Sequence, residues 1–193
     1  MDGCGKTTLI NRLTACLEEL DIAPKLTKQP TPYVRESAIF RTYMDNPNHD
    51  EYDYRALSLL CASDRVQHCN RQILPWLTEG ETVISDRYFY SCLANLRARG
   101  YEKDTWIYEV ARSIPRPDVA FFIDVDVETA VARVRSRASE RERYIDMELQ
   151  QKLRREYLSI ARDVGGVVIS THQSEEVCFQ QVKHAVQEVM HCV

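Results

Sequence analysis

Apolar residues recur at helical spacing along most of the chain. Leu9, Leu13, Leu17 and Leu20 lie three or four residues apart, which is typical of a helix that packs one face against a sheet. A longer helix is predicted over residues 54–77. Further helices are predicted over residues 34–44, 127–136, 147–163 and 175–190, and between residue 88 and about residue 112.

Four short runs have the character of strands. Residues 118–125, D-V-A-F-F-I-D-V, form a nearly continuous apolar run, typical of a strand whose two faces are both covered. The other three runs are residues 24–30, 82–85 and 167–170. Because these strands alternate with helices, we predict an α/β fold with a mostly parallel central sheet and helices on both faces.

Polar residues follow two of the predicted strands. Lys28, Gln29 and Pro30 end the first of them, and Asp86 and Arg87 follow the second. In open α/β sheets, ligands bind at the carboxyl ends of the strands. We therefore expect both segments to face a ligand, with capping of the following helix as the alternative role for Asp86.

Composition and charge limit the classes of protein to consider. The chain has 193 residues, of which 44% are hydrophobic, so we predict a single domain over residues 1–193. The net charge of −4 argues against a uniformly basic surface, and nucleic acid is not an expected partner. The longest strongly apolar run is far too short to span a bilayer, so no membrane partner is expected.

The cysteines indicate a reducing compartment. The seven cysteines form no C-x-x-C pair and are odd in number, which favours reduced thiols over disulfides or a zinc site. The N-terminus has no basic segment followed by an apolar run. A cytoplasmic location is therefore expected.

The first eight residues, M-D-G-C-G-K-T-T, contain the end of a phosphate-binding loop, G-x-x-x-x-G-K-[ST]. In this motif glycines let backbone N–H groups close around phosphate, Lys6 reaches the terminal phosphates, and Thr7 is a ligand for Mg²⁺. The helix that follows would point its N-terminus at the phosphate. A glycine-rich turn before an ordinary helix is the alternative. The residues expected to contact the nucleotide are Gly3, Cys4, Gly5, Lys6, Thr7 and Thr8.

The motif is incomplete at its start. Its first glycine would stand five residues before Gly5, at position zero, and the strand that leads into the loop would lie further upstream. Two expectations remain open. Either the true start of the protein lies upstream of Met1, or the chain lacks its first strand and binds ATP poorly, because the neighbouring strands would lose backbone hydrogen-bond partners.

Six segments, in order and over essentially the whole chain, resemble the thymidylate kinases, a family of nucleoside monophosphate kinases. The resemblance implies the three-layer fold of P-loop NTPases, and transfer of a phosphoryl group from ATP, with Mg²⁺, to dTMP. The segments are residues 2–8, T-K-Q-P at 27–30, A-S-D-R-V-Q-H at 62–68, I-L-P-W-L-T-E-G at 73–80, V-I-S-D-R-Y at 83–88 with Ser91, and P-D at 117–118 leading to I-D-V-D at 123–126.

The resemblance also implies roles for single residues. Asp2 and Lys6 would lie near the transferred phosphoryl group, Arg87 would bind the acceptor monophosphate, and Asp86 would bind magnesium or water. Arg65 would read the thymine edge, with a solvent-exposed pair with Asp64 as the alternative. A phosphoryl-transfer site needs the fixed positive charge that Lys6 and Arg87 supply. The remaining substrate contacts would come from Cys61, Tyr88 and Ser91.

Residues 136–146 occupy the position of a lid that closes over ATP in the family. Cys4 stands where other members carry an arginine in the phosphate loop, so the resemblance implies a catalytic arginine in the lid. Arg141 and Arg143 are the candidates, and the E-R-E-R run at 140–143 leaves the register between them open. The alternative is a surface helix of arginine and glutamate without a catalytic role.

Three features depart from the family in the half of the site that reads the base. Cys61 replaces a phenylalanine that stacks on thymine, Asn95 replaces a tyrosine that excludes a ribose 2′-hydroxyl, and Q-P-T-P at 29–32 replaces E-P-G-G. Two alternatives therefore stay open: a kinase of another nucleotide or small phosphoryl acceptor, and a nucleotide-binding protein without catalysis. The family also implies a possible homodimer.

Overall fold

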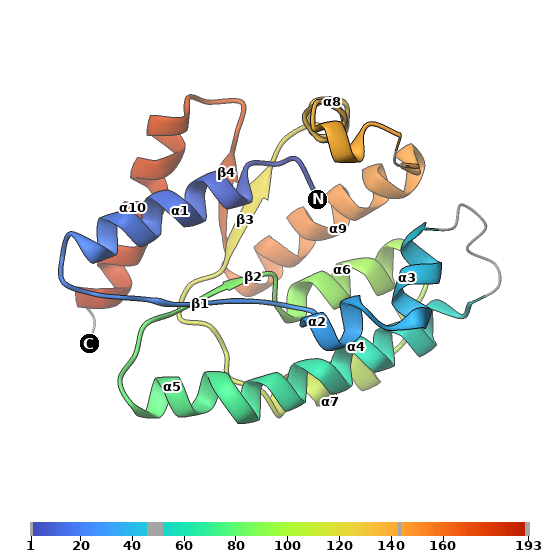
Figure 1. The fold of residues 1–193 in the computed structure, drawn as a ribbon, viewed down its shortest axis with the longest axis horizontal. Helices are drawn as coiled ribbons and strands as arrows, with labels where there is room; N and C mark the ends of the chain where they lie inside the picture. Colours follow the sequence, from blue (N-terminus) through green and yellow to red (C-terminus); the bar gives the residue numbers. More distant parts are fainter. Residues whose placement is uncertain (1, 46–51, 143, 192–193) are drawn as a thin grey trace. The chain divides into compact units, whose positions relative to one another are not determined.

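The computed structural model describes residues 2–45, 52–142 and 144–191, and the chain divides into two compact units (Figure 1). Unit 1 consists of Met1–Ala23 and Pro117–Val193, and unit 2 consists of Pro24–Arg116. Unit 2 is therefore an insertion between the two segments of unit 1.

Unit 1 is built on two parallel strands, β3 (Phe121–Asp124) and β4 (Val167–Ser170). Residues 2–5 form turns that lead into α1. Helix α1 packs along α10, where Arg12 binds Glu176 at 2.6 Å and lies over the ring of Phe179 at 4.2 Å (Figure 1). The helices of this unit are α1 (Lys6–Glu18), α8 (Val127–Arg135), the 3₁₀ turn η3 (Ala138–Glu140), α9 (Met147–Val164) and α10 (Glu175–His191).

The apolar stripe predicted for the first helix is confirmed over three of its four leucines. Leu9, Leu13 and Leu17 are buried. Leu20 is 58% exposed, because α1 ends at Glu18 and the chain turns before Leu20.

Unit 2 is also built on two parallel strands, β1 (Lys25–Lys28) and β2 (Val83–Asp86), paired from Lys25 with Val83 to Lys28 with Asp86. The carboxyl ends of both strands thus lie at one edge. The helices are α2 (Pro32–Arg35), α3 (Ala38–Asp45), α4 (Tyr54–His68), the π-helical turn η2 (Cys69–Ile73), α5 (Leu74–Thr78), α6 (Phe89–Ala98) and α7 (Trp106–Arg112).

Two predicted helices of unit 2 are interrupted. The helix predicted over residues 34–44 is split at Ser37, whose hydroxyl donates to Val34 O at the end of α2 and accepts from the N–H of Phe40 at the start of α3. The helix predicted over residues 54–77 continues as α4, η2 and α5. The π-helical turn lies just before Pro75, which has no N–H to continue a regular α-helical ladder.

The predicted parallel α/β architecture is confirmed. The strand predicted over residues 118–125 is shorter, since β3 is Phe121–Asp124, whereas β4 has the predicted bounds. Within the described ranges each sheet has two strands. We predicted helices on both faces of the sheet. Leu26 of β1 and Val168 of β4 are exposed, so the strands are not covered along their whole length.

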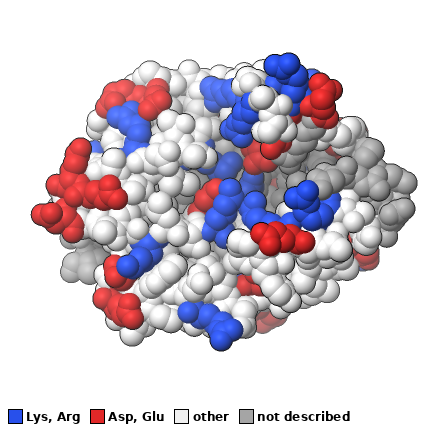
Figure 2. Space-filling view, in the orientation of Figure 1, with Lys and Arg blue, Asp and Glu red and all other residues white. Residues whose placement is uncertain are grey.

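The surface mixes both signs of charge. Acidic and basic side chains are spread over the visible face and neither sign covers it (Figure 2). The six cysteines in the described part of the chain carry free thiols. No helix within the described ranges has both the length and the hydropathy of a membrane span.

Candidate functional site

The turn before α1 depends on two glycines. Gly3 and Gly5 have φ angles of 77° and 93°, in the left-handed region that favours glycine. A Cβ atom on Gly3 would lie 2.2 Å from the carbonyl oxygen of Ala130 in α8. Gly3 is therefore required both by its backbone angles and by the close approach of α8.

The segments that follow β3 and β4 contact the turn formed by residues 2–5. Cys4 is buried against Val125 and Ala130. The hydroxyl of Thr171 lies 3.2 Å from Cys4 O, and the N–H of Thr171 donates to Asp124 O at 2.8 Å. The loop is thus braced by side chain and backbone contacts within unit 1.

The structure gathers the predicted nucleotide contacts at the N-terminus of α1. Lys6 is the first residue of this helix, and its Nζ lies 4.0 Å from Asp2 Oδ1 and 3.6 Å from Cys4 Sγ. Thr7 and Thr8 follow in the first turn and are exposed. The first N–H groups of a helix have no intrahelical partner, so the lysine charge and the helix N-terminus offer an anion site together.

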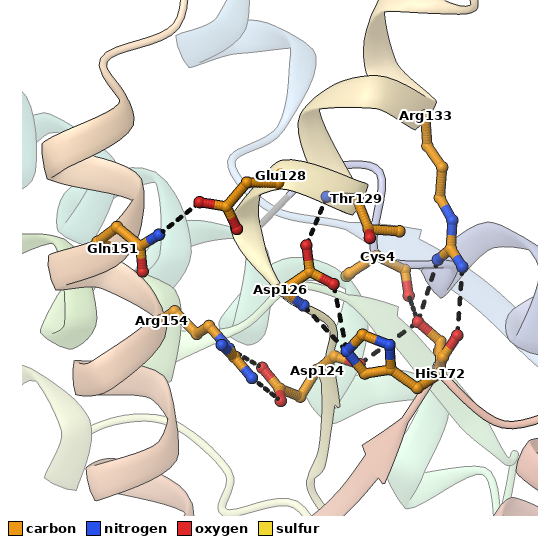
Figure 3. Close-up of polar contacts among 10 residues, drawn as sticks. Cys4, Asp124, Asp126, Glu128, Thr129, Arg133, Gln151, Arg154 and His172 are labelled. Atoms are coloured by element: carbon orange, nitrogen blue, oxygen red, sulfur yellow. Dashed lines mark hydrogen bonds and ion pairs between the residues drawn. The ribbon is translucent and has the colours of Figure 1, made fainter.

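Charged groups that sequence reasoning did not single out lie beside this loop (Figure 3). Asp124, at the end of β3, accepts two hydrogen bonds from Arg154 of α9, at 2.7 and 2.8 Å. This contact raises the pKa of the Arg154 guanidinium. The I-D-V-D segment in the sequence pointed to Asp124. The helical pattern of residues 147–163 does not show which arginine pairs with it.

Asp126 caps α8 and also faces His172. Its carboxylate accepts from the N–H of Thr129 at 2.6 Å, and this bond holds the pKa of Asp126 below its usual range. The His172 Nε2 atom lies 3.3 Å from Asp126 Oδ2 (Figure 3). These contacts fix the start of α8, the helix that approaches Gly3.

The predicted lid spans the connection between α8 and α9. Arg141 is exposed in a turn after η3. Arg143 lies outside the described residues. Within the described part of residues 136–146 the chain forms the short turn η3 and no α-helix. Another arginine of this region, Arg133, donates to Oγ1 and O of Thr171 at 3.1 and 3.2 Å.

Arg65 lies in the interior of unit 2. Its side chain is 1% exposed and donates to Gln29 Oε1 at 2.6 Å and to Cys92 Sγ at 3.0 Å. Burial alone would lower the pKa of Arg65, but the sulfur atoms of Cys92, Cys61 and Cys69 together outweigh it and the pKa is raised. The alternative of a solvent-exposed pair with Asp64 is wrong, because Asp64 instead accepts hydrogen bonds from the N–H and hydroxyl of Thr31.

His68 belongs to the same network. Because Gln29 Oε1 accepts from Arg65, the Gln29 amide nitrogen donates to His68 Nδ1 at 2.9 Å. His68 Nε2–H then donates to Thr27 Oγ1 at 2.9 Å. Burial lowers the pKa of His68. The T-K-Q-P segment is therefore anchored to α4 through Gln29, a link that helical periodicity does not reveal.

The other predicted substrate residues lie on α4 and at the start of α6, two helices that pack together. Cys61 is buried, which raises the pKa of its thiol to about 12. The Tyr88 hydroxyl donates to Pro115 O at 2.8 Å, and burial raises its pKa. Ser91 O accepts from the Asn95 side chain at 2.8 Å, and Arg99 donates to Asn95 Oδ1 at 2.7 Å.

Asp86 and Arg87 stand at the carboxyl end of β2. Asp86 Oδ2 pairs with Lys28 Nζ at 3.0 Å, whereas Asp86 Oδ1 is buried and has no hydrogen-bond partner within the described residues. The capping alternative is wrong, since the N-cap of α6 is Tyr88 and no side chain caps it. Arg87 has a φ angle of 72°, a strained value for a residue other than glycine. Such strain is common at functional sites.

Each unit has an oxygen donor whose chemistry suits magnesium. Mg²⁺ prefers carboxylate and hydroxyl oxygens. Thr7 offers an exposed hydroxyl at the phosphate loop, and Asp86 offers a buried carboxylate oxygen without a partner in the described part of the chain. A buried unpaired carboxylate oxygen is costly unless it binds a cation or water.

Comparisons with known proteins identify the family. The thymidylate kinase family model matches residues 1–182. A probable thymidylate kinase of Pyrococcus horikoshii is 39% identical over 163 residues, covering 83% of this chain and 79% of the relative. Those of Pyrococcus abyssi and Thermococcus kodakarensis are 37% and 36% identical over 166 residues, covering 83% of this chain and 79% and 80% of the relatives. The chain therefore belongs to the thymidylate kinase family of nucleoside monophosphate kinases, as its motifs predicted.

Proposed function

We propose that this chain transfers the γ-phosphoryl group of ATP to dTMP and releases dTDP and ADP. The observation that carries the proposal is the match of the thymidylate kinase family model to residues 1–182. The family also implies a P-loop fold, and we include the predicted three-layer arrangement, a single functional domain and a homodimer in the proposal.

The donor side of the proposed reaction lies in unit 1. Lys6 places its ammonium group on the terminal phosphates of ATP, and the N–H groups around Gly3 and Gly5 surround them. Asp2, 4.0 Å from Lys6, lies near the transferred group. Arg141 and Arg143 remain the proposed catalytic arginines of the lid, where a guanidinium would stabilise the transferring phosphate.

Thr7 and Asp86 are the proposed magnesium ligands. When bound, Mg²⁺ neutralises charge on the phosphate oxygens. The Oδ1 atom of Asp86, which has no hydrogen-bond partner among the described residues, supports this role. Lys28 pairs with the other oxygen, Oδ2, at 3.0 Å and so places a positive charge beside the carboxylate.

The acceptor side of the proposed reaction lies in unit 2. Arg87 binds the monophosphate of dTMP, and its strained backbone supports this assignment. Arg65 and Cys61 on α4, with Tyr88 and Ser91, form the proposed base and sugar site. Because Cys61 cannot stack on a base as an aromatic ring does, base binding forfeits about 1–3 kcal/mol relative to a stacked ring.

An acceptor panel tests the proposal and its alternative. The purified chain is assayed with ATP, Mg²⁺ and each pyrimidine and purine monophosphate, in the deoxy and ribose forms. We expect the highest kcat/KM with dTMP. Cys61 and the restrained Asn95 are the features that favour another acceptor. A higher kcat/KM for a different monophosphate would replace dTMP in the proposal, and turnover of none would contradict a kinase.

A further inference from the structure

We infer that Thr171 is a positioning residue for the phosphate loop, because its hydroxyl fixes the peptide group between Cys4 and Gly5. The inference rests on the proposed ATP site and names a residue that sets its geometry. Thr171 lies after β4, 167 residues from Cys4 in sequence, and its Oγ1 is 3.2 Å from Cys4 O.

Because a trans peptide is planar, this contact also determines where the N–H of Gly5 points. The carbonyl of Cys4 and the N–H of Gly5 belong to one planar group and point in opposite directions. A donor that holds Cys4 O on one side therefore directs the Gly5 N–H to the other side. In a phosphate loop the N–H groups must face the phosphate oxygens, so the orientation of this peptide bears directly on ATP affinity.

The peptide needs such a restraint because of the residue that follows it. Gly5 has a φ angle of 93°, and glycine adopts positive and negative φ values at similar cost. Rotation of the Cys4–Gly5 peptide therefore meets little resistance from Gly5 itself. The Thr171 methyl group also restricts movement of Gly5 toward it, since it lies 3.4 Å from the position that a Cβ of Gly5 would occupy.

Thr171 is itself firmly placed. Its N–H donates to Asp124 O at 2.8 Å, and Arg133 donates to its Oγ1 at 3.1 Å and to its carbonyl at 3.2 Å. Since Oγ1 accepts from Arg133, its own hydrogen is left to donate. Two carbonyl oxygens are in range, Cys4 O at 3.2 Å and Asp124 O at 3.3 Å, and Asp124 O already accepts from the Thr171 N–H. The Cys4 carbonyl is thus the nearer of the two acceptors, and the hydroxyl is the group of Thr171 that reaches it.

Two substitutions separate the hydroxyl from the shape of the side chain. Thr171→Val keeps the methyl group and loses the hydroxyl, whereas Thr171→Ser keeps the hydroxyl and loses the methyl group. The dissociation constant of ATP is measured with Mg²⁺ and without an acceptor, together with the KM values for ATP and dTMP. We expect Thr171→Val to weaken ATP binding about three- to tenfold, the range of one hydrogen bond, and Thr171→Ser to bind nearly as wild type. The KM for dTMP should not change.

A matched control removes an equivalent hydroxyl elsewhere in the same unit. Thr14 in α1 donates to Ile10 O at 3.0 Å, and Thr14→Val should leave ATP affinity unchanged. Wild-type affinity in Thr171→Val, or equal losses in the valine and serine variants, would overturn the positioning role. If ATP affinity responds as expected but dTMP is not phosphorylated, the role of Thr171 stands and the proposed acceptor falls. A wild-type chain that binds no ATP would overturn both.

Discussion

Arg65 carries a positive charge into the interior of unit 2, where Gln29 Oε1 and Cys92 Sγ accept its hydrogen bonds. We predict that Arg65→Met raises the KM for dTMP by about 10- to 100-fold, the range of hydrogen bonds from a charged group. The KM for ATP should stay constant. Stability should fall by about 1–3 kcal/mol, because the buried Gln29 Oε1 loses its donor.

The matched control for this prediction is Arg71→Met, in an exposed position of the adjoining η2 turn. Steady-state kinetics and thermal unfolding are measured on both variants. An unchanged KM for dTMP in Arg65→Met would contradict its role in reading the base. Equal changes in both KM values would indicate a general structural loss instead.

His68 should make stability depend on pH. Burial lowers the pKa of His68, so the unfolded chain binds a proton at a higher pH than the folded chain does. Stability is therefore full above about pH 6.5, the pKa of a free histidine, and falls as the pH drops below it. We predict that His68→Gln reduces this slope in urea unfolding between about pH 6.5 and pH 5, above the range in which most carboxylates titrate.

His184 provides the control, because it is an exposed histidine on α10. His184→Gln should keep the pH slope of the wild-type chain. If His68→Gln also keeps the wild-type pH slope, His68 in its network with Thr27 and Gln29 does not set the pH dependence of stability.

Single residues were predictable from the sequence where a motif fixed them. Lys6 and Arg87 stand in segments that define the family, so their positions at a helix start and a strand end followed directly. The burial of Arg65 did not follow. Its partners lie 36 and 27 residues away, at Gln29 and Cys92, and helical periodicity shows the face of a helix but not what contacts it.

At the scale of elements, α8 fixes how closely the phosphate loop is packed. We predict that Gly3→Ala raises the KM for ATP at least tenfold, because the new Cβ would lie 2.2 Å from Ala130 O and the loop would have to shift. Gly80→Ala is the control, since Gly80 has a similar φ angle of 79° but no described atom lies within 4 Å of the place that its Cβ would occupy. Steady-state kinetics measure the difference, and equal KM values for ATP in the two variants would refute the packing argument.

Helix α9 is joined to β3 by the two hydrogen bonds from Arg154 to Asp124. Arg154→Met would leave the largely buried Asp124 carboxylate without this partner. We predict a loss of about 1–3 kcal/mol in the free energy of unfolding, measured by urea denaturation. Arg155→Met, at the exposed neighbouring position, should change it little. A loss of the same size in both variants would argue against a specific contribution of the α9–β3 contact.

Most elements were predictable, but several of their ends were not. The pattern gave the positions of β4 and of the helices around residues 127–136 and 147–163. It did not show the break at Ser37 or the π-helical turn before Pro75. These ends depend on local hydrogen bonds to side chains and on a missing N–H, which apolar periodicity does not encode.

At the scale of the whole molecule, the proposed donor and acceptor residues belong to different units. Lys6 and Gly3 belong to unit 1, whereas Arg65 and Arg87 belong to unit 2. The length of 193 residues and the hydrophobic content of 44% predicted a single domain. A proline stands at each junction, Pro24 at the start of unit 2 and Pro117 where unit 1 resumes.

The most direct test of the central claim follows the labelled γ-phosphoryl group of ATP in a reaction with dTMP and Mg²⁺. Labelled dTDP should form in amounts equal to ADP with the wild-type chain. Formation should fall at least a hundredfold with Lys6→Ala and with Arg87→Ala, because each removes fixed positive charge from a transferring phosphate. Labelled inorganic phosphate without dTDP, or full transfer by either alanine variant, would contradict a kinase that uses these two residues.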